Sequence, residues 1–389
     1  MLLSERIQHI TASQSLAMSA RCTAMKASGV DVISMCLGEP DMDTPGHIRR
    51  AAQQAIDNHW SHYGPVPGIP SLRAAIALQQ NGTSGNAITW QAEDVLVSVG
   101  AKMAIYNTIQ TIVNAGDEVI IPMPAWVSYS EMVKLAGGIV IPIQTCFEDD
   151  YLLTPEQLRA SLSQRTRLLI LCSPNNPTGS IYSRRQLQAI LEVLRDFPNV
   201  VVLSDEIYSC LIYEGDAVSL AAFEDFADRI VIINGVSKAY AMTGYRVGWL
   251  LSKNQEFVNA CARLQGQQVT CATMIAQKAA EAAITGSQDC VEAMRQIFAE
   301  RRELICRLAA DIPGFAFHKP QGAFYLFPDV SAIGTGDAVA EFLLENAHVA
   351  VVSGSAFGSP SCIRLSYAIA TDEISEAMRR IQETLKKCS

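Results

Sequence analysis

The chain has 389 residues, a hydrophobic fraction of 49%, a charged fraction of 18% and a formal net charge of −9. This length allows two or three domains around a large core, and the composition is that of an ordinary folded protein. The acidic charge without a basic block argues against a nucleic-acid partner, and no apolar run is long enough to predict a membrane span.

Cysteine usage indicates a reducing compartment. The 11 cysteines form no C-x-x-C pair, and their number is odd. The opening MLLSERIQHI is too polar for a secretory signal, so we expect reduced thiols and a cytoplasmic protein. His59 and His62 have no cysteine or carboxylate cluster around them, and we therefore expect them to be surface or packing residues and the protein to hold no metal.

The chain begins with a polar arm and a predicted helix over 13–27. A short strand over 32–37 runs into the loop Gly38-Glu39-Pro40-Asp41. Pro45 suits the first turn of a helix through residue 56, and another helix is predicted over 70–80. We assign residues 1–44 to an N-terminal arm and part of a small domain.

Residues 45–285 predict a large α/β domain. Short apolar runs alternate with helical patterns, which indicates a mostly parallel sheet covered by helices on both faces. Right-handed crossovers would place the carboxyl ends of the strands, and the loops after them, along one edge. The runs are 95–99, 119–121, 139–143, 168–172, 200–203 and 230–233, and the clearest helical patterns are 103–113, 185–194 and 255–264.

The pattern changes after residue 272. A long helix is predicted over 290–309, and a helix over 337–345 and a closing helix from 371 follow it. Short strands are predicted around 315–317, 323–327, 349–352 and 362–365. This indicates a smaller α+β domain over 286–389, which the N-terminal arm completes.

One loop combines a hydroxyl, an amine and a guanidinium. The apolar run 230–233 delivers Ser237 and Lys238 into a turn, and Arg246 follows. Desolvation and the nearby positive charge should lower the pKa of the lysine, and a neutral lysine can form a Schiff base with a carbonyl. Ser237 and Arg246 suit a phosphate. The alternative is a solvated loop lysine.

Four further loops follow the predicted strands. Gly100, Ala101 and Lys102 open a helix, where free N–H groups can bind an anion, although an ordinary turn has the same pattern. Trp126 can lie on an aromatic ring or belong to the core. Asn176 lies in a turn that prolines make rigid, and it can also form a local Asx turn.

The last of these loops carries Asp205 at the end of a buried strand. A buried carboxylate is costly unless it is paired with a cation, and a protonated pyridine nitrogen is such a partner. Alternatively, Asp205 caps the next helix.

The order of these motifs is more specific than any one of them. GAK, PAW, NNPTG, DEIY, SKAYAMTGYR and CIRLSY, together with LGEPDMDTP, YGPVPGIPSLR, WVSYSEMVKLAGG and GAFY, strongly resemble the class I and II aminotransferases of pyridoxal phosphate (PLP) fold type I. The resemblance extends from about Ser4 to the last helix. It is greatest to the aspartate aminotransferase branch often called subgroup Ib.

The resemblance implies roles for residues around the cofactor. Lys238 would form the Schiff base with PLP and carry protons, and Asp205 would pair with the pyridine N–H, keeping the ring able to accept electrons. Asn176 and Tyr208 would hydrogen-bond the phenolic oxygen, and Trp126 would stack on the ring.

The phosphate would be bound by residues from several loops and from a second subunit. Tyr63 of a neighbouring subunit would join them, which implies a homodimer with shared active sites. The resemblance places Gly100, Ala101, Lys102, Ser237 and Arg246 in this part of the site.

The same resemblance implies transamination between an L-amino acid and a 2-oxo acid by a ping-pong mechanism. Arg364 would bind the α-carboxylate bidentately, with help from the N–H of Gly38, and Trp126 and Asn176 would also border the substrate. Lys102 and Ser15 would meet the distal carboxylate of aspartate. The arm departs from the usual pattern, since Ala12 replaces a common proline and Ser15 an expected threonine.

Several other functions share part of this pattern. A prephenate or aromatic aminotransferase of the same fold, or a PLP-dependent C–S lyase, would share most of these residues. A nicotinamide dehydrogenase requires G-x-G-x-x-G after the first strand, whereas Gly334-Thr335-Gly336 lies late in the chain. A transcription regulator would need a helix-turn-helix module, for which there is no room before Gly38.

Overall fold

The computed structural model describes residues 3–12, 14–215 and 218–387, and it describes no side chain for Ser15. Its centre is a seven-stranded sheet in which only β8 runs antiparallel to its neighbours. The prediction of a mostly parallel sheet is therefore confirmed. In spatial order the strands are β2 (Val95–Val99), β8 (Val247–Leu251), β7 (Ile230–Gly235), β6 (Val201–Asp205), β5 (Thr166–Cys172), β3 (Glu118–Met123) and β4 (Ile139–Gln144).

Both faces of this sheet are buried, which explains why its strands read as continuous apolar runs. Successive side chains of a strand point to opposite faces, so Leu168 and Ile170 join one hydrophobic cluster and Leu169 and Leu171 another. The first cluster includes side chains from α5 (Ala101–Ile112), α6 (Ser128–Leu135) and α10 (Gln255–Gln268). The second includes side chains from α3 (Gly46–Asp57), α4 (Pro70–Asn81), α7 (Pro155–Ser161), α8 (Arg184–Val193) and α11 (Met274–Thr285).

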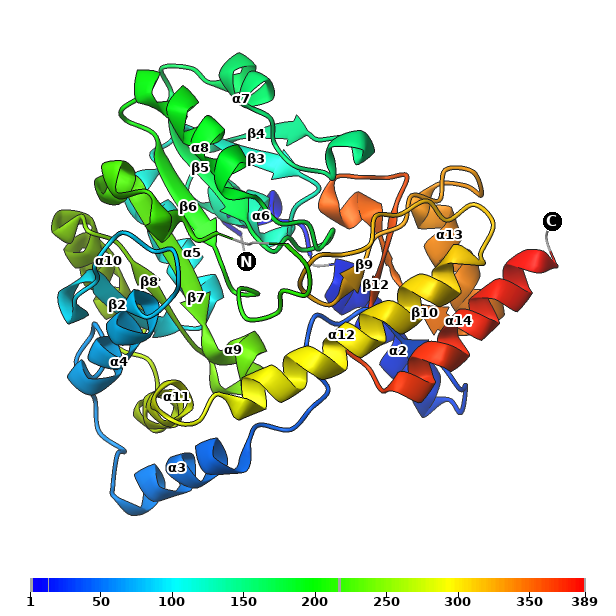
Figure 1. Ribbon diagram of the computed structural model, residues 1–389, viewed down its shortest axis with the longest axis horizontal. Coiled ribbons are helices and arrows are strands. Elements are labelled where there is room, and N and C mark those ends of the chain that lie inside the picture. Colours follow the sequence, from blue (N-terminus) through cyan, green and yellow to red (C-terminus); the bar gives the residue numbers. More distant parts are fainter. Residues whose placement is uncertain (1–2, 13, 216–217, 388–389) are drawn as a thin grey trace.

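A smaller layer of helices and short strands lies beside the large sheet (Figure 1). The long helix α12 (Asp289–Ala310) runs from one part to the other and packs on α14 (Thr371–Lys386). A separate core, which includes Phe298 and Phe324, fills this part. Its other elements are α2 (Gln14–Ala27), α13 (Gly336–Phe342), a three-stranded sheet of β11 (Val352–Ser353), β12 (Ile363–Ser366) and β9 (Tyr325–Leu326), and a two-stranded sheet of β1 (Ile33–Ser34) and β10 (Val349–Ala350).

The short strands of the small part differ most from the prediction. The strand expected around 315–317 is wrong: Ala316 makes a single bridge to Asp329, directly after a turn at Gly314, and no ladder continues from it. The run 349–352 divides between two sheets, since β10 pairs with β1 and β11 with β12. Residues 343–347 continue the helix α13 as a π-helical turn.

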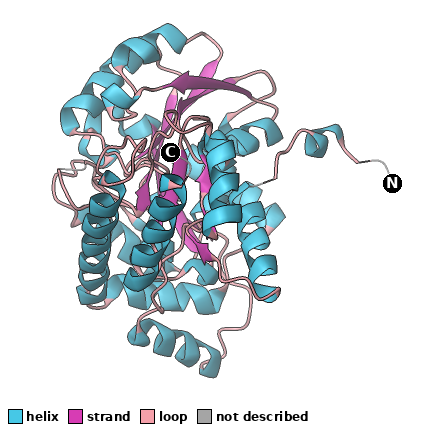
Figure 2. Cartoon of the chain, turned by 90° about the vertical axis from the view of Figure 1, so that its right-hand side faces the viewer, coloured by secondary structure: helices cyan, strands magenta, loops and turns pink. Residues whose placement is uncertain are grey.

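The N-terminal arm leaves the body of the molecule, as Figure 2 shows. It carries the short helix α1 (Glu5–Gln8) and touches the large part where the Thr11 N–H donates to Glu131 Oε2 at 2.8 Å. Within the described residues, no helix is both long and apolar enough to cross a membrane.

Candidate active site

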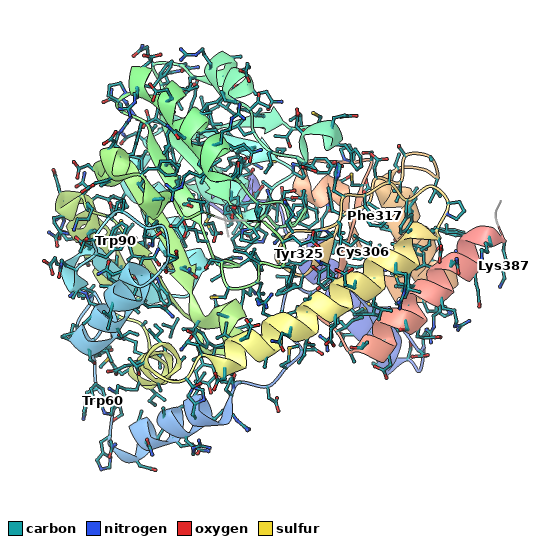
Figure 3. The ribbon with its side chains drawn as sticks, in the orientation of Figure 1. Trp60, Trp90, Cys306, Phe317, Tyr325 and Lys387 are labelled. Atoms are coloured by element: carbon teal, nitrogen blue, oxygen red, sulfur yellow. The ribbon has the colours of Figure 1, made fainter. Side chains whose placement is uncertain are left out.

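A cavity of about 370 Å³ lies where the carboxyl ends of the central strands face the small part of the molecule. The large part contributes Ala101, Lys102, Ile105, Trp126, Ser128, Tyr129, Cys172, Asn176, Asp205, Ile207, Tyr208, Ser237, Lys238, Thr243 and Arg246, and the remaining lining is Leu16, Cys36, Leu37, Gly38, Tyr325 and Arg364. Figure 3 labels Tyr325 at this junction. Most of the predicted site residues are therefore brought together.

Lys238 enters the cavity from the short helix α9 (Val236–Ala239), directly after β7. Its Nζ donates a hydrogen bond of 2.6 Å to the Gly38 carbonyl. Burial lowers the pKa of Lys238 to about 8; the negative charge of Glu39 opposes this, and the positive charge of Arg246 adds to it. The predicted direction is confirmed, because a partly dry site disfavours the ammonium form.

Asp205 ends β6, and its side chain is only 4% exposed. Tyr129 Oη donates to Oδ2 at 2.6 Å, and the Ile207 N–H donates to Oδ1 at 3.2 Å. The second contact closes a local turn and not the helix cap that the sequence offered as an alternative, because a turn and not a helix follows Asp205 directly. The first contact is not local. Burial raises the pKa of Asp205 to about 6, although the hydrogen bond from Tyr129 lowers it. A cation in the cavity would relieve this cost.

The opposite end of the cavity is suited to an anion. Gly100 caps α5 with φ of 80°, and Ala101 and Lys102 form the first turn of that helix. The guanidinium of Arg246 packs against Gly100 so closely that a Cβ there would lie 2.6 Å from Nη2. Free N–H groups at the start of a helix, a nearby arginine and the buried Ser237 are the groups that bind phosphate.

Arg364 on β12 is 3% exposed and is held from three sides. Nη1 donates to Asn176 Oδ1 at 2.9 Å, and Nη2 donates to the Cys36 carbonyl. Its guanidinium lies 4.5 Å from the Tyr325 ring centroid and 4.8 Å from that of Phe357. Among the described residues, its buried Nε has no hydrogen-bond partner. A buried donor of this kind is expected to have a ligand.

Tyrosines link the two parts of the molecule inside the cavity. Tyr208, on the loop after β6, and Tyr325 on β9 share a hydrogen bond of 2.8 Å between their hydroxyls. Tyr325 also lies against Gly38, where a Cβ would approach its hydroxyl to 2.1 Å. Gly38 is therefore small because the chain passes directly over this tyrosine.

Lys102 and Trp126 were expected to meet substrate and cofactor, and they contact each other. The Lys102 Nζ lies 4.7 Å from the Trp126 ring centroid. Burial lowers the pKa of Lys102, and the positive charge of Arg246 lowers it further. A partly desolvated lysine without an acid next to it attracts an anion.

Among the described residues, the predicted site residues Gly100 and Tyr63 are not part of the cavity lining. Tyr63 is 89% exposed, and the side chain of Ser15 lies outside the described residues. Sequence reasoning also missed two members of the site, Tyr129 and Tyr325. Both lie in strings that carry the family resemblance. Tyr129 lies in the first turn of α6, three residues after Trp126, which precedes that helix.

The fold and the site together define an α/β enzyme of PLP fold type I. A family model for aminotransferases of class I and II matches residues 30–381. The chain therefore belongs to this family, and its cofactor is pyridoxal 5′-phosphate. It is a transaminase that acts on amino acids and 2-oxo acids.

Curated relatives agree with this assignment. The chain is 42% identical to an aspartate aminotransferase of Bacillus sp. (strain YM-2), with 99% of each chain covered. It is 38% identical to a probable aspartate/prephenate aminotransferase of Aquifex aeolicus, again with 99% of each chain covered.

Solved structures extend the likeness to the whole fold. The aspartate aminotransferase of Rhizobium meliloti matches with a TM-score of 0.95 and 36% identity over 99% of each chain. The Thermus thermophilus enzyme with maleate matches with a TM-score of 0.94 and 36% identity, over 99% of this chain and 100% of that chain.

The cavity fits the cofactor that the family implies. It offers an anion site, an amine with a lowered pKa and a buried carboxylate that needs a cation. These match the phosphate, the aldehyde and the ring nitrogen of PLP.

Proposed function

We propose that this enzyme moves the amino group of aspartate to a 2-oxo acid such as 2-oxoglutarate, with Lys238 as the lysine that binds the cofactor. The observation that carries the proposal is the single cavity that joins Lys238, Asp205 and Arg364. The names of the relatives favour aspartate as the amino donor.

Different residues of the cavity would bind the different groups of the cofactor. Gly100, Ala101, Ser237 and Arg246 would bind the phosphate, and Asp205 would bind the ring nitrogen. Asn176 and Tyr208 would bind the phenolic oxygen, and Trp126 would contact the ring. When bound, PLP supplies an electron-poor ring that takes up the electron pair left when the substrate loses its α-proton.

Lys238 then moves the proton. A pKa near 8 leaves more of the amine neutral at physiological pH than in a solvated lysine. It can therefore accept the α-proton of the substrate and would return it to the C4′ carbon of the cofactor, two atoms away. Its hydrogen bond to the Gly38 carbonyl holds the amine at the side of the cavity nearest the small part. Asp205 keeps its charge paired and so holds the ring nitrogen protonated.

Arg364 and Lys102 select a dicarboxylic substrate. Arg364 binds the α-carboxylate together with the Gly38 N–H, because its planar guanidinium matches a carboxylate. Lys102, with Ser15 from the arm, binds the distal carboxylate. Prephenate is a second candidate acceptor, because the relative from Aquifex aeolicus is named for it.

Three further assignments complete the proposal. Tyr63, which is 89% exposed, reaches the phosphate of a second subunit in a homodimer, and a monomer in analytical ultracentrifugation would contradict this.

The protein is cytoplasmic. Residues 1–44 and 286–389 form the small domain, and residues 45–285 form the large one.

The experiment is borohydride reduction of the PLP-loaded protein, followed by peptide mapping. We expect the reduced cofactor on the peptide that contains Lys238, and no label in the Lys238→Ala variant. Label on Lys102, the other lysine that lines the cavity, would overturn the assignment. Adding single amino acids to the loaded protein and following its visible band then ranks the donors.

A further inference from the structure

Tyr129 contacts the carboxylate of Asp205 in the candidate active site. Its hydroxyl donates to Asp205 Oδ2 at 2.6 Å, and both side chains are buried, at 2% and 4% exposure. A hydrogen bond to an ionised acceptor is stronger than one between neutral groups. This contact is therefore the strongest single restraint on the Asp205 carboxylate that the protein supplies.

Hydrogen bonds hold both oxygens of the Asp205 carboxylate. Oδ1 accepts from the Ile207 N–H at 3.2 Å while Oδ2 accepts from Tyr129, so each oxygen has a donor of its own. A carboxylate has about four lone-pair sites, which leaves sites on both oxygens for a ligand. With both oxygens held, the plane of the carboxylate cannot rotate freely toward or away from the cavity.

Tyr129 is itself held rigidly. It lies on α6 in a cluster with Met132 and Val133, and its ring meets that of Trp126 edge-on, with centroids 5.4 Å apart. Trp126 lies just before α6 and Tyr129 lies in its first turn, so one short segment carries both the ring proposed to stack on the cofactor and the donor that fixes Asp205.

Two other elements and the next residue in the chain supply the titratable groups around Asp205. Lys238 on α9 attracts the carboxylate, the buried Cys172 thiol at the end of β5 donates to the Pro174 carbonyl, and Glu206 is the next residue in the chain. Lys238 has its own acceptor at Gly38. Tyr129 is the side chain that donates directly to Asp205.

We propose that Tyr129 is a positioning residue that holds Asp205 ionised and correctly oriented for the ring nitrogen of the cofactor. The inference rests on the proposed function, in which Asp205 receives that nitrogen. Tyr129 acts entirely through Asp205, so its effect must vanish when Asp205 cannot ionise.

Binding of pyridoxamine 5′-phosphate to the apoenzyme tests this. This form of the cofactor carries no aldehyde, so it does not condense with Lys238. Equilibrium dialysis between pH 5 and 8 gives an affinity that falls as Asp205 takes up a proton. We call this fall in affinity at low pH the acid limb of the binding profile. Tyr129→Phe removes a donor that lowers the pKa of Asp205, so the acid limb should move to higher pH by about one unit.

Tyr182→Phe is the matched control. Tyr182 is equally buried at 2% exposure, and its hydroxyl accepts from the Leu153 N–H at 3.0 Å, outside the cavity. It loses a buried hydroxyl of the same kind, and its acid limb should stay with that of the natural chain. If both tyrosine variants shift alike, the effect comes from general loosening and the proposal is overturned.

Asp205→Asn separates this inference from the proposed function. It should weaken binding and remove the acid limb, and the double variant with Tyr129→Phe should bind like Asp205→Asn alone. An unchanged profile in Asp205→Asn would refute the role of Asp205 itself. A normal loss in Asp205→Asn, together with an unshifted limb in Tyr129→Phe, would refute only the role of Tyr129.

A second substitution covers the case in which Tyr129→Phe fails to fold. Site-specific 3-fluorotyrosine at position 129 keeps the ring in place and makes the hydroxyl a stronger donor. It should therefore move the acid limb to lower pH, opposite to the phenylalanine variant. A shift upward, or none, contradicts the proposal.

Discussion

At the scale of single residues, the site is defined by charges that have been removed from water. Lys238, Asp205 and Lys102 are all shifted away from their charged forms by burial. In the chain alone, each of these groups gains from a partner of opposite charge. The cofactor and a dicarboxylic substrate together offer such partners, so binding and charge compensation are the same event.

Lys102→Ala should raise KM for aspartate far more than for alanine. Only aspartate has a distal carboxylate, and a hydrogen-bonded charge pair of this kind contributes about 2 kcal/mol. We therefore expect KM for aspartate to increase about thirtyfold, and kcat with alanine to change little. Steady-state kinetics with both donors measures this. Lys134→Ala, on the exposed side of α6 where Lys134 pairs with Glu131, is the control. Equal changes for both donors would remove Lys102 from the distal site.

At the scale of elements, the anion site depends on how closely β8 approaches the start of α5. A Cβ on Gly248 would lie 2.2 Å from the Ala101 backbone nitrogen, which is one of the N–H groups proposed to bind phosphate. Strand and helix therefore touch backbone to backbone at this point, and no side chain separates them.

Gly248→Ala should accordingly weaken PLP binding at least tenfold. The added methyl must push the first turn of α5 away from β8, and overpacking of this kind typically costs about 1–3 kcal/mol. Titration of the apoenzyme with PLP and thermal unfolding report the two effects. Gly82→Ala is the matched control, because its methyl would meet its nearest atoms at 3.5 Å. Unchanged PLP affinity in Gly248→Ala would show that the start of α5 does not bind the phosphate.

The elements of the large part were predictable because their strands are buried on both faces. The continuous apolar run 168–172 predicts a strand whichever of its residues face each side of the sheet, because both faces accept apolar side chains. The short strands of the small part carry no such redundancy. Whether residues near Ala316 continue a ladder depends on the path of Asp329, which is remote in sequence, so local pattern could not decide it.

At the scale of the whole molecule, the site needed contacts that no local motif encodes. The order of motifs placed Lys238, Asp205 and Arg364 correctly in one cavity. The hydrogen bonds from Tyr129 to Asp205 and from Tyr208 to Tyr325 join segments that only the folded chain brings together. Sequence could name the strings that contain these tyrosines, but it could not show which hydroxyl meets which acceptor.

One buried carboxyl links this architecture to the stability of the apoenzyme. Glu206 is 4% exposed, and Oε1 accepts from Ser204, Ser219 and the Leu220 N–H. Burial still raises its pKa to about 7, from an ordinary value of 4.5. The folded chain therefore binds this proton more tightly than the unfolded chain. Between these two pH values the unfolded chain releases the proton and is stabilised by doing so, whereas the folded chain still holds it.

The free energy of unfolding should consequently fall as the pH rises from 4.5 to 7, and Glu206→Gln should flatten this dependence. The linkage corresponds to a few kcal/mol at most. Urea unfolding of both apoenzymes at pH 5 and pH 8 measures it, and the difference between the two proteins cancels other titrating groups such as Asp205. Glu256→Gln, on an exposed turn of α10, should retain the slope of the natural chain. Parallel slopes in the natural chain and Glu206→Gln would mean that Glu206 keeps an ordinary pKa despite its burial.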